Sequence, residues 1–221
     1  MTETSDIQEK QQQLDSLRRQ VASLESEVAS SRLSDQWNYD KFYSTYYATV
    51  GFVYGGIAAM ASLLLNVIAA PIAGKHPLEI IRVYLTFPLG ERALGLTSGE
   101  KSQYVINDGV ILALGCCLYI GTGMVLGIVF HWVICRLALN KPLVTRLAVG
   151  TVLAVVVWIV NFYLILAWLQ PLLFRGSWIT DNSILPWWVA LGTHLVFGWT
   201  MALMAPLGAF VPYTRPTDQP A

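Results

Sequence analysis

Four long apolar runs alternate with polar segments along the chain. They cover about residues 48–73, 109–135, 147–174 and 187–210, and their interiors contain no Asp, Glu, Lys or Arg. Each run exceeds the roughly 20 residues that a helix needs to cross the hydrocarbon core of a bilayer. The alternating polarity of membrane β-strands, in segments of about 10 residues, is not found. The pattern therefore predicts an all-α membrane protein with four transmembrane helices in a bundle.

The first 36 residues have a different periodicity and predict a short heptad helix with a linker. The a positions are Ile7, Leu14, Val21 and Val28, and the apolar d positions are Leu17 and Leu24. Mostly β-branched residues at a with Leu at d favour a parallel two-stranded coiled coil. Oligomerisation is therefore expected through Leu14, Leu17, Val21, Leu24 and Val28. The alternative is a solitary amphipathic helix on the bilayer or a neighbour, because short heptad stretches are marginal alone.

The rest of the chain divides into a membrane domain, residues 37–212, and a tail, residues 213–221, that is expected to be disordered. Within the domain, residues 76–100 predict an interfacial helical loop. Pro77 suits a first helical turn, and Pro88 is expected to end that helix.

Composition and charge support a membrane protein. Hydrophobic residues make up 55% of the chain and charged residues 13%, against about 25% charged residues in soluble domains. The formal net charge is zero, so no global field attracts nucleic acid. The three cysteines are odd in number and lie in one apolar run and at its end, so a disulfide framework is not expected.

Four spans place both termini on one side of the membrane. The short loop between the second and third spans contains Arg136, Lys141 and Arg146, and Arg32 and Lys41 precede the first span. The positive-inside rule therefore favours cytoplasmic termini, although basic residues also occur on the other side. The N-terminus lacks the pattern of a cleaved signal peptide, so the first span is expected to act as its own insertion signal.

A few polar residues interrupt the spans and form the candidate intramembrane site. At a rise of about 1.5 Å per residue, His194 and Asn66 lie at similar depth and Asn161 lies nearer the midplane. Polar groups in lipid are costly and usually point into the bundle. We expect His194 to form a structural hydrogen bond with Asn66 or Asn161. The alternative is a proton relay or a ligand site at this level.

The histidines also bear on cofactor binding. His131 is expected near the opposite surface, facing headgroups or a neighbouring chain. Its level differs from that of His194 by about 15 Å or more, which argues against a haem held by both histidines in one chain. No cofactor or metal is expected, and a redox subunit that shares a cofactor with another chain is a third hypothesis.

Small residues at four-residue spacing predict close helix packing. They are Gly51 and Gly55 in the first span, Gly123 and Gly127 in the second, and Gly198 in the fourth. Such faces serve either tight packing within the chain or pairing with a partner subunit. The third span is mostly large and β-branched and is predicted to face lipid, apart from its Asn161.

Motifs of catalysis and nucleotide binding are missing. The sequence has no Walker loop, GxGxxG, HExxH or GxSxG, and no charged residue inside a span. We therefore expect a non-catalytic protein: an accessory or assembly subunit of a larger, possibly respiratory, membrane complex, or a homo-oligomer. The expected partners are the lipid bilayer, and this chain itself or another membrane protein, through the N-terminal helix and the glycine faces. The alternative is a small transporter, channel or proton-conducting subunit that uses Asn66, Asn161 and His194.

Overall fold

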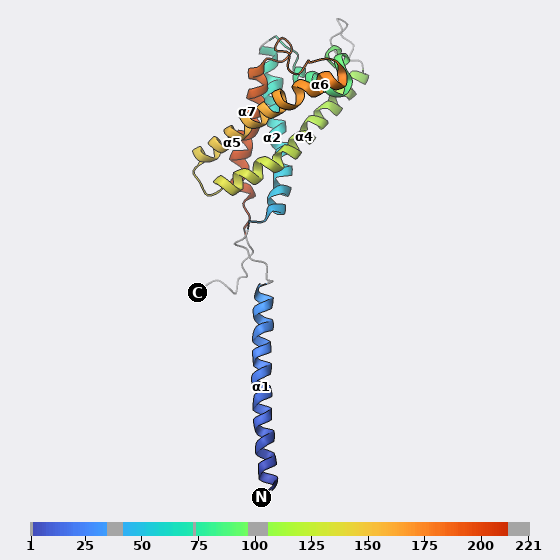
Figure 1. Cartoon of the computed structure of the whole chain (residues 1–221). Helices are drawn as coiled ribbons and strands as arrows, with labels where there is room; N and C mark the ends of the chain where they lie inside the picture. The colour runs from blue at the N-terminus through green and yellow to red at the C-terminus, as the bar shows by residue number, and fades with distance from the viewer. Residues whose placement is uncertain (1, 35–41, 73, 97–105, 212–221) are drawn as a thin grey trace. The chain divides into compact units, whose positions relative to one another are not determined.

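A computed structural model describes residues 2–34, 42–72, 74–96 and 106–211. The chain separates into two compact units, Met1–Phe42 and Tyr43–Ala221, which are described one at a time. Every regular element of the described residues is helical (Figure 1). The predicted tail at 213–221 lies outside the described residues.

The first unit contains one continuous helix, α1 (Thr2–Ser34). The side chains of its predicted seam are between 48% and 59% exposed; they are Leu14, Leu17, Val21, Leu24 and Val28. Because this apolar stripe is open along the helix, its pairing in a coiled coil stays a prediction.

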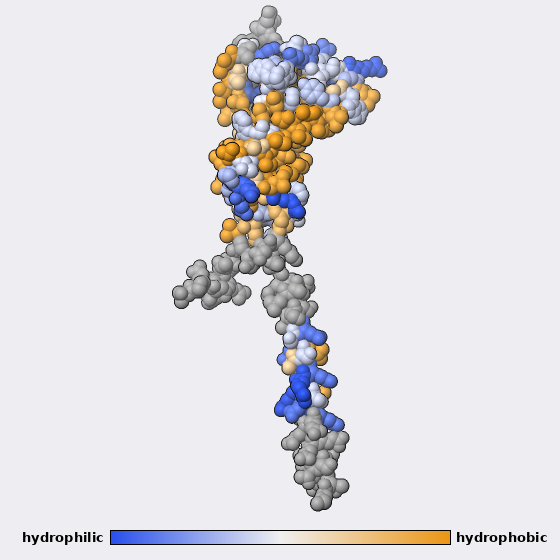
Figure 2. All heavy atoms as spheres, turned by 60° about the vertical axis from the view of Figure 1, so that its left-hand side comes forward, coloured by the Kyte–Doolittle hydropathy of each residue, from blue (hydrophilic) through white to orange (hydrophobic). Residues whose placement is uncertain are grey.

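The second unit contains four helices that are long and apolar enough to cross a membrane, as the sequence predicts. The first, second and fourth spans are α2 (Ser44–Ile72), α4 (Ile106–Ala138), and α7 (Trp187–Met204) with its extension η3 (Ala205–Gly208). The third runs without a break through α5 (Leu143–Ile159), η2 (Val160–Leu166) and α6 (Ala167–Phe174). Figure 2 shows a wide hydrophobic band across this unit with hydrophilic residues gathered towards its two ends. This distribution fits a bundle surrounded by lipid.

The spans do not pack equally on one another. Helix α2 packs along α4 and also contacts α7, while α5 packs along α7 and touches α4 much less. The third span has only 6% of its apolar window buried, against 22–39% in the other three. The third span is therefore the least buried of the four, which agrees with the prediction that it faces lipid.

Helices α2 and α4 approach each other backbone to backbone. A Cβ atom added at Gly55 would lie 2.3 Å from the carbonyl oxygen of Gly123, and one at Gly127 would lie 2.3 Å from that of Gly51. Only glycine permits this approach. The two glycine faces are therefore used inside the chain.

Helices α5 and α7 make a second close approach. A Cβ atom added at Gly198 would lie 2.6 Å from the carbonyl oxygen of Gly150. The same added atom would lie 3.1 Å from Cβ of Ala154. Gly198 therefore also serves internal packing, and its partner Gly150 was not singled out from the sequence.

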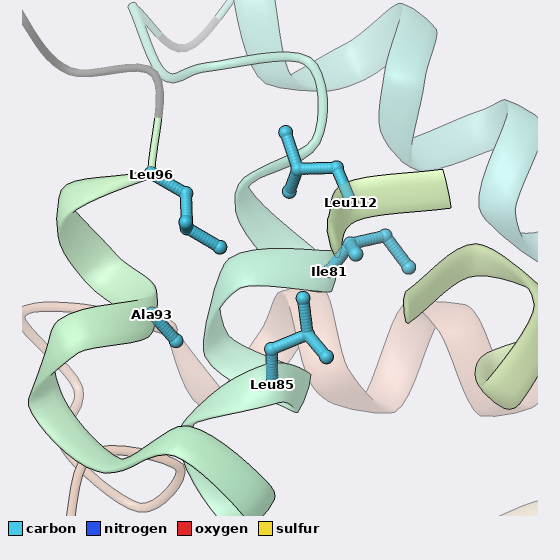
Figure 3. Packing of buried hydrophobic residues seen from close by; sticks show 5 residues of the cluster. All are labelled: Ile81, Leu85, Ala93, Leu96 and Leu112. Atoms are coloured by element: carbon cyan, nitrogen blue, oxygen red, sulfur yellow. The ribbon is translucent and has the colours of Figure 1, made fainter. Parts of the chain in front are cut away.

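In the segment predicted as an interfacial loop, the structure has α3 (Glu79–Leu89) followed by the 3₁₀-helix η1 (Gly90–Gly95). Figure 3 shows a buried cluster formed by Ile81 and Leu85 of α3, Ala93 and Leu96 of the following turn, and Leu112 of α4. Leu85 also packs over Gly115, where a Cβ atom would lie 2.7 Å from its side chain. Helix α3 is thus built into the bundle and packs against the side of α4.

The start of α3 is held by a histidine outside the spans. The backbone N–H of Leu78 donates to Nδ1 of His76 over 3.1 Å. Burial and the nearby charge of Arg82 lower the pKa of His76. The ring therefore stays neutral at physiological pH, which keeps Nδ1 available as an acceptor.

A buried amide joins three segments at one end of the bundle. Gln170 of α6 is fully buried, and its Nε2 donates to Oγ1 of Thr86 in α3 over 2.8 Å. Its Oε1 accepts from the backbone N–H of Ile179 over 2.9 Å. These bonds fix α3 and the loop at residues 175–186 against the third span.

Candidate functional site

His194 lies in the second turn of α7 and faces the bundle interior. Its Nδ1 is 2.8 Å from the carbonyl oxygen of Ala190, one turn earlier in the same helix. Because a carbonyl only accepts, Nδ1 carries the proton and Nε2 of the neutral ring is an acceptor. The expected bond to Asn66 or Asn161 is therefore replaced by one within α7, where a carbonyl four residues away is in reach without movement of another helix.

Asn161 lies in η2, which is a π-helix. Such turns are rare and are often found at functional sites. The side chain of Asn161 is half-buried and forms no hydrogen bond with the residues that the structure describes, and it lines the same cavity as His194. Two of the three residues of the predicted polar site are therefore brought together.

Asn66 is the member of the predicted site that stays apart. It is buried, but its Nδ2 donates to the carbonyl oxygen of Ser62 in its own helix over 2.8 Å, and it does not line the cavity. Ser62 takes its place at the level of His194. Its Oγ donates to the carbonyl oxygen of Thr193 over 3.0 Å and lies 3.0 Å from the hydroxyl of Tyr119.

The cavity has a volume of about 140 Å³ and lies among α2, α3, α4, α7 and the third span. Its aromatic lining residues are Tyr84, Tyr119, Phe130, Phe162 and Phe197. Tyr84 and Tyr119 meet edge to face at 5.7 Å between ring centroids, and Phe130 and Phe197 meet at 5.1 Å. The cavity is therefore mostly apolar, with a few hydroxyl and nitrogen groups in its wall.

The hydrogen bonds in the wall determine which groups are left to accept. Ser62 uses its proton on a carbonyl of α7, so the hydroxyl of Tyr119 donates to Ser62. Thr122 likewise donates to a carbonyl one turn earlier in α4, so the hydroxyl of Tyr84 donates to Thr122. Both tyrosine oxygens keep lone pairs that can accept. Together with Nε2 of His194, they make the polar part of the wall rich in acceptors.

Sequence reasoning missed Tyr84, Tyr119 and Thr122. Tyr84 lies in the segment predicted as an interfacial loop, and the other two were not singled out. A usable signal was present, because Tyr119 and Thr122 lie beside Gly123, on the part of the second span that was predicted to pack closely.

His131 lies elsewhere in the bundle, and its predicted exposure is wrong. The side chain is fully buried, with its ring 5.4 Å from that of Tyr54 in an edge contact. A Cβ atom at Gly51 would lie 2.8 Å from Cβ of His131, and one at Gly208 would lie 3.1 Å from its Cε1. These two glycines let α2 and η3 close over the imidazole, so it faces neither headgroups nor a neighbouring chain.

Metal-ligating side chains are scattered over the described part of the chain. No group of three or more His, Cys, Asp or Glu residues placed to hold a metal ion occurs there. His131 has Cys135 beside it, with Sγ 3.5 Å from Nε2. His194 belongs to the separate cavity, so the two histidines do not share a site.

Comparison of the chain with protein-family models, with curated proteins and with solved structures gives no match. The features of the described residues that bear on function are the exposed seam on α1 and the cavity in the second unit.

Proposed function

We propose that this chain is a non-catalytic membrane protein that assembles through α1, with α1 of a second copy as the partner. The exposed apolar seam of α1 carries the proposal: each of its five side chains is about half exposed in the single chain. Full burial of a Val or Leu side chain is worth about 1.5–3 kcal/mol. A partner helix along the seam would remove this apolar surface from water.

The heptad positions favour a parallel pair. Leu17 and Leu24 at d and β-branched Val21 and Val28 at a are the combination that suits two parallel strands. Two copies inserted in one bilayer with the same orientation extend their N-terminal helices from the same side, which also suits a parallel pair. The glycine faces pack inside the chain, so they add little to such an assembly.

The double substitution Leu17→Asp/Leu24→Asp tests this assembly. We expect wild-type protein to be a dimer in mild detergent and the variant to be a monomer, with dimer affinity lowered at least about 100-fold, because two buried side chains per copy are lost. Ser16→Asp/Ser23→Asp is the matched control. It adds the same charge one residue away, outside the seam, and should leave the dimer intact.

Detergent-corrected mass from light scattering gives the result. An unchanged mass for the seam variant would contradict assembly through α1. A monomeric wild type would contradict a second copy as the partner. A different subunit that copurifies from the native membrane in stoichiometric amount, and is lost from the seam variant, would identify the chain as an accessory subunit.

A small transporter or proton-conducting subunit is the second candidate, favoured by the shared cavity of His194 and Asn161. For this function we expect proteoliposomes with a trapped pH-sensitive dye to show proton flux that His194→Leu abolishes at normal folded yield. Thr200→Leu removes another polar side chain of α7, one that bonds within its own helix outside the cavity, and should keep the flux. The absence of flux from wild-type proteoliposomes would exclude proton conduction.

A further inference from the structure

We infer that the cavity beside His194 binds the phenol head of a neutral lipid-phase amphiphile, whose alkyl tail remains in the bilayer. The inference rests on the size of the cavity, its aromatic wall, its surplus of hydrogen-bond acceptors and its opening towards lipid. It is independent of assembly through α1, since every residue that lines the cavity belongs to the second unit.

The volume of the cavity and its aromatic wall fit a ligand with a single aromatic ring. The volume of about 140 Å³ is close to the roughly 150 Å³ of an engineered apolar cavity that holds benzene. Aromatic rings pack well edge to face against other rings. Phe130 and Phe197 from two helices, and Phe162 from a third, offer such faces and edges around the space.

The polar groups in the cavity wall fit a ligand that carries a hydroxyl group on that ring. Nε2 of His194 is an acceptor without a hydrogen-bond partner among the described residues, and the oxygens of Tyr84 and Tyr119 have already used their protons. A hydrocarbon would leave these acceptors unsatisfied in an apolar space, which costs free energy. A phenol supplies one O–H donor, and its oxygen can accept from the amide of Asn161.

The charge of the wall and the exposure of Thr122 indicate where the ligand comes from. None of the described residues that line the cavity is charged, so an ionic head would have no counter-charge. Thr122 lines the cavity and is also exposed on the outer face of α4, next to Leu118 and Val125, which are 50% and 60% exposed. Because one side chain both lines the cavity and is exposed, the cavity reaches the outer surface of the bundle at Thr122.

Equilibrium dialysis tests the inference with full-length protein in phosphatidylcholine nanodiscs against empty nanodiscs. The probes are 4-pentylphenol, pentylbenzene, which lacks the hydroxyl, and 4-pentylcyclohexanol, which lacks the aromatic ring. We expect saturable binding of one 4-pentylphenol per chain above the lipid background. Both analogues should bind at least about tenfold more weakly. Pentylbenzene loses the hydrogen bond of the hydroxyl, and 4-pentylcyclohexanol loses the edge-to-face contacts of the aromatic ring.

Variants connect the binding to the cavity. His194→Leu should weaken 4-pentylphenol binding about tenfold and leave pentylbenzene binding unchanged, whereas Val157→Phe, which fills the space, should weaken both. Thr200→Leu is the control in the same helix. The hydroxyl of Thr200 donates to the carbonyl oxygen of Val196 within α7 and does not line the cavity, so its loss should change neither. Size-exclusion profiles and thermal unfolding establish that each variant is folded.

Three results would overturn the inference. They are the absence of saturable binding above empty nanodiscs, equal binding of 4-pentylphenol and either analogue, and unchanged phenol binding by folded His194→Leu protein. Because binding is measured without transport, the proton-conduction candidate fails or survives separately in the flux assay.

Discussion

Gly127→Leu is expected to prevent the second unit from forming its bundle. A Cβ atom at this position would lie 2.3 Å from the carbonyl oxygen of Gly51 and 2.4 Å from Cα of Gly55. Both atoms belong to the backbone of α2, so no side-chain rotation relieves the overlap and the two helices must separate. Overpacking that side chains absorb already costs about 1–3 kcal/mol, and native proteins are stable by only about 5–15 kcal/mol.

The matched control is Gly121→Leu in the same helix. A Cβ atom there meets nothing within 4 Å, so this variant should fold with wild-type yield. The measurement is the yield of monodisperse protein in detergent together with its thermal unfolding temperature. Equal yield and stability of the Gly127 and Gly121 variants would show that the α2–α4 approach is not a requirement of the fold.

Gln170→Leu is expected to give the second large loss of stability, about 2–3 kcal/mol in the free energy of unfolding. Leucine is similar in size but leaves the backbone N–H of Ile179 and the hydroxyl of Thr86 without the bonds that the amide makes. Unsatisfied buried polar groups cost about 1–3 kcal/mol each. The loop at residues 175–186 should therefore loosen before the rest of the bundle.

Asn66→Leu provides the comparison for this prediction. The amide of Asn66 is also buried in a span, but among the described residues it bonds to a carbonyl of its own helix and to no other helix. We expect its loss to cost less than about 1 kcal/mol, in the range of average intramembrane hydrogen bonds. Denaturant unfolding in mixed micelles and proteolysis of the loop measure the two effects. A cost for Gln170→Leu no greater than that for Asn66→Leu would refute the structural role of the three-way junction.

The four spans were predictable because the bilayer demands long apolar helices whatever their neighbours. The low burial of the third span was predictable as well, because its large side chains are visible in the sequence. The glycine spacing indicated that these helices approach another helix closely, but it did not indicate which helix. The step from Gly150 to Ala154 has the same spacing and was overlooked among the bulky residues of that span.

The cavity and the burial of His131 depend on which helices become neighbours, and periodicity along one helix does not contain that information. Depth alone placed His131 near a surface. Its burial follows from two glycines, Gly51 and Gly208, that lie far apart in the sequence. The depth estimate placed His194 level with Asn66, whereas His194 shares its cavity with Asn161. Tyr84 of the cavity wall comes from α3, whose insertion into the bundle was not predicted.

The π-helix in the third span sets the angle around the helix axis between two buried residues that lie on either side of it. Ala154, against α7, and Gln170, against α3, are separated by 16 residues, which in a regular α-helix places them about 160° apart around the axis. The one extra residue of a π-turn reduces this angle by about 100°, to roughly 60°. Both residues are fully buried, so the irregular turn lets one helix direct both towards the bundle. A single-residue deletion within residues 160–166 would leave these two residues 15 positions apart in a regular α-helix, again about 60° around the axis, so the span should lose its π-turn and keep both contacts.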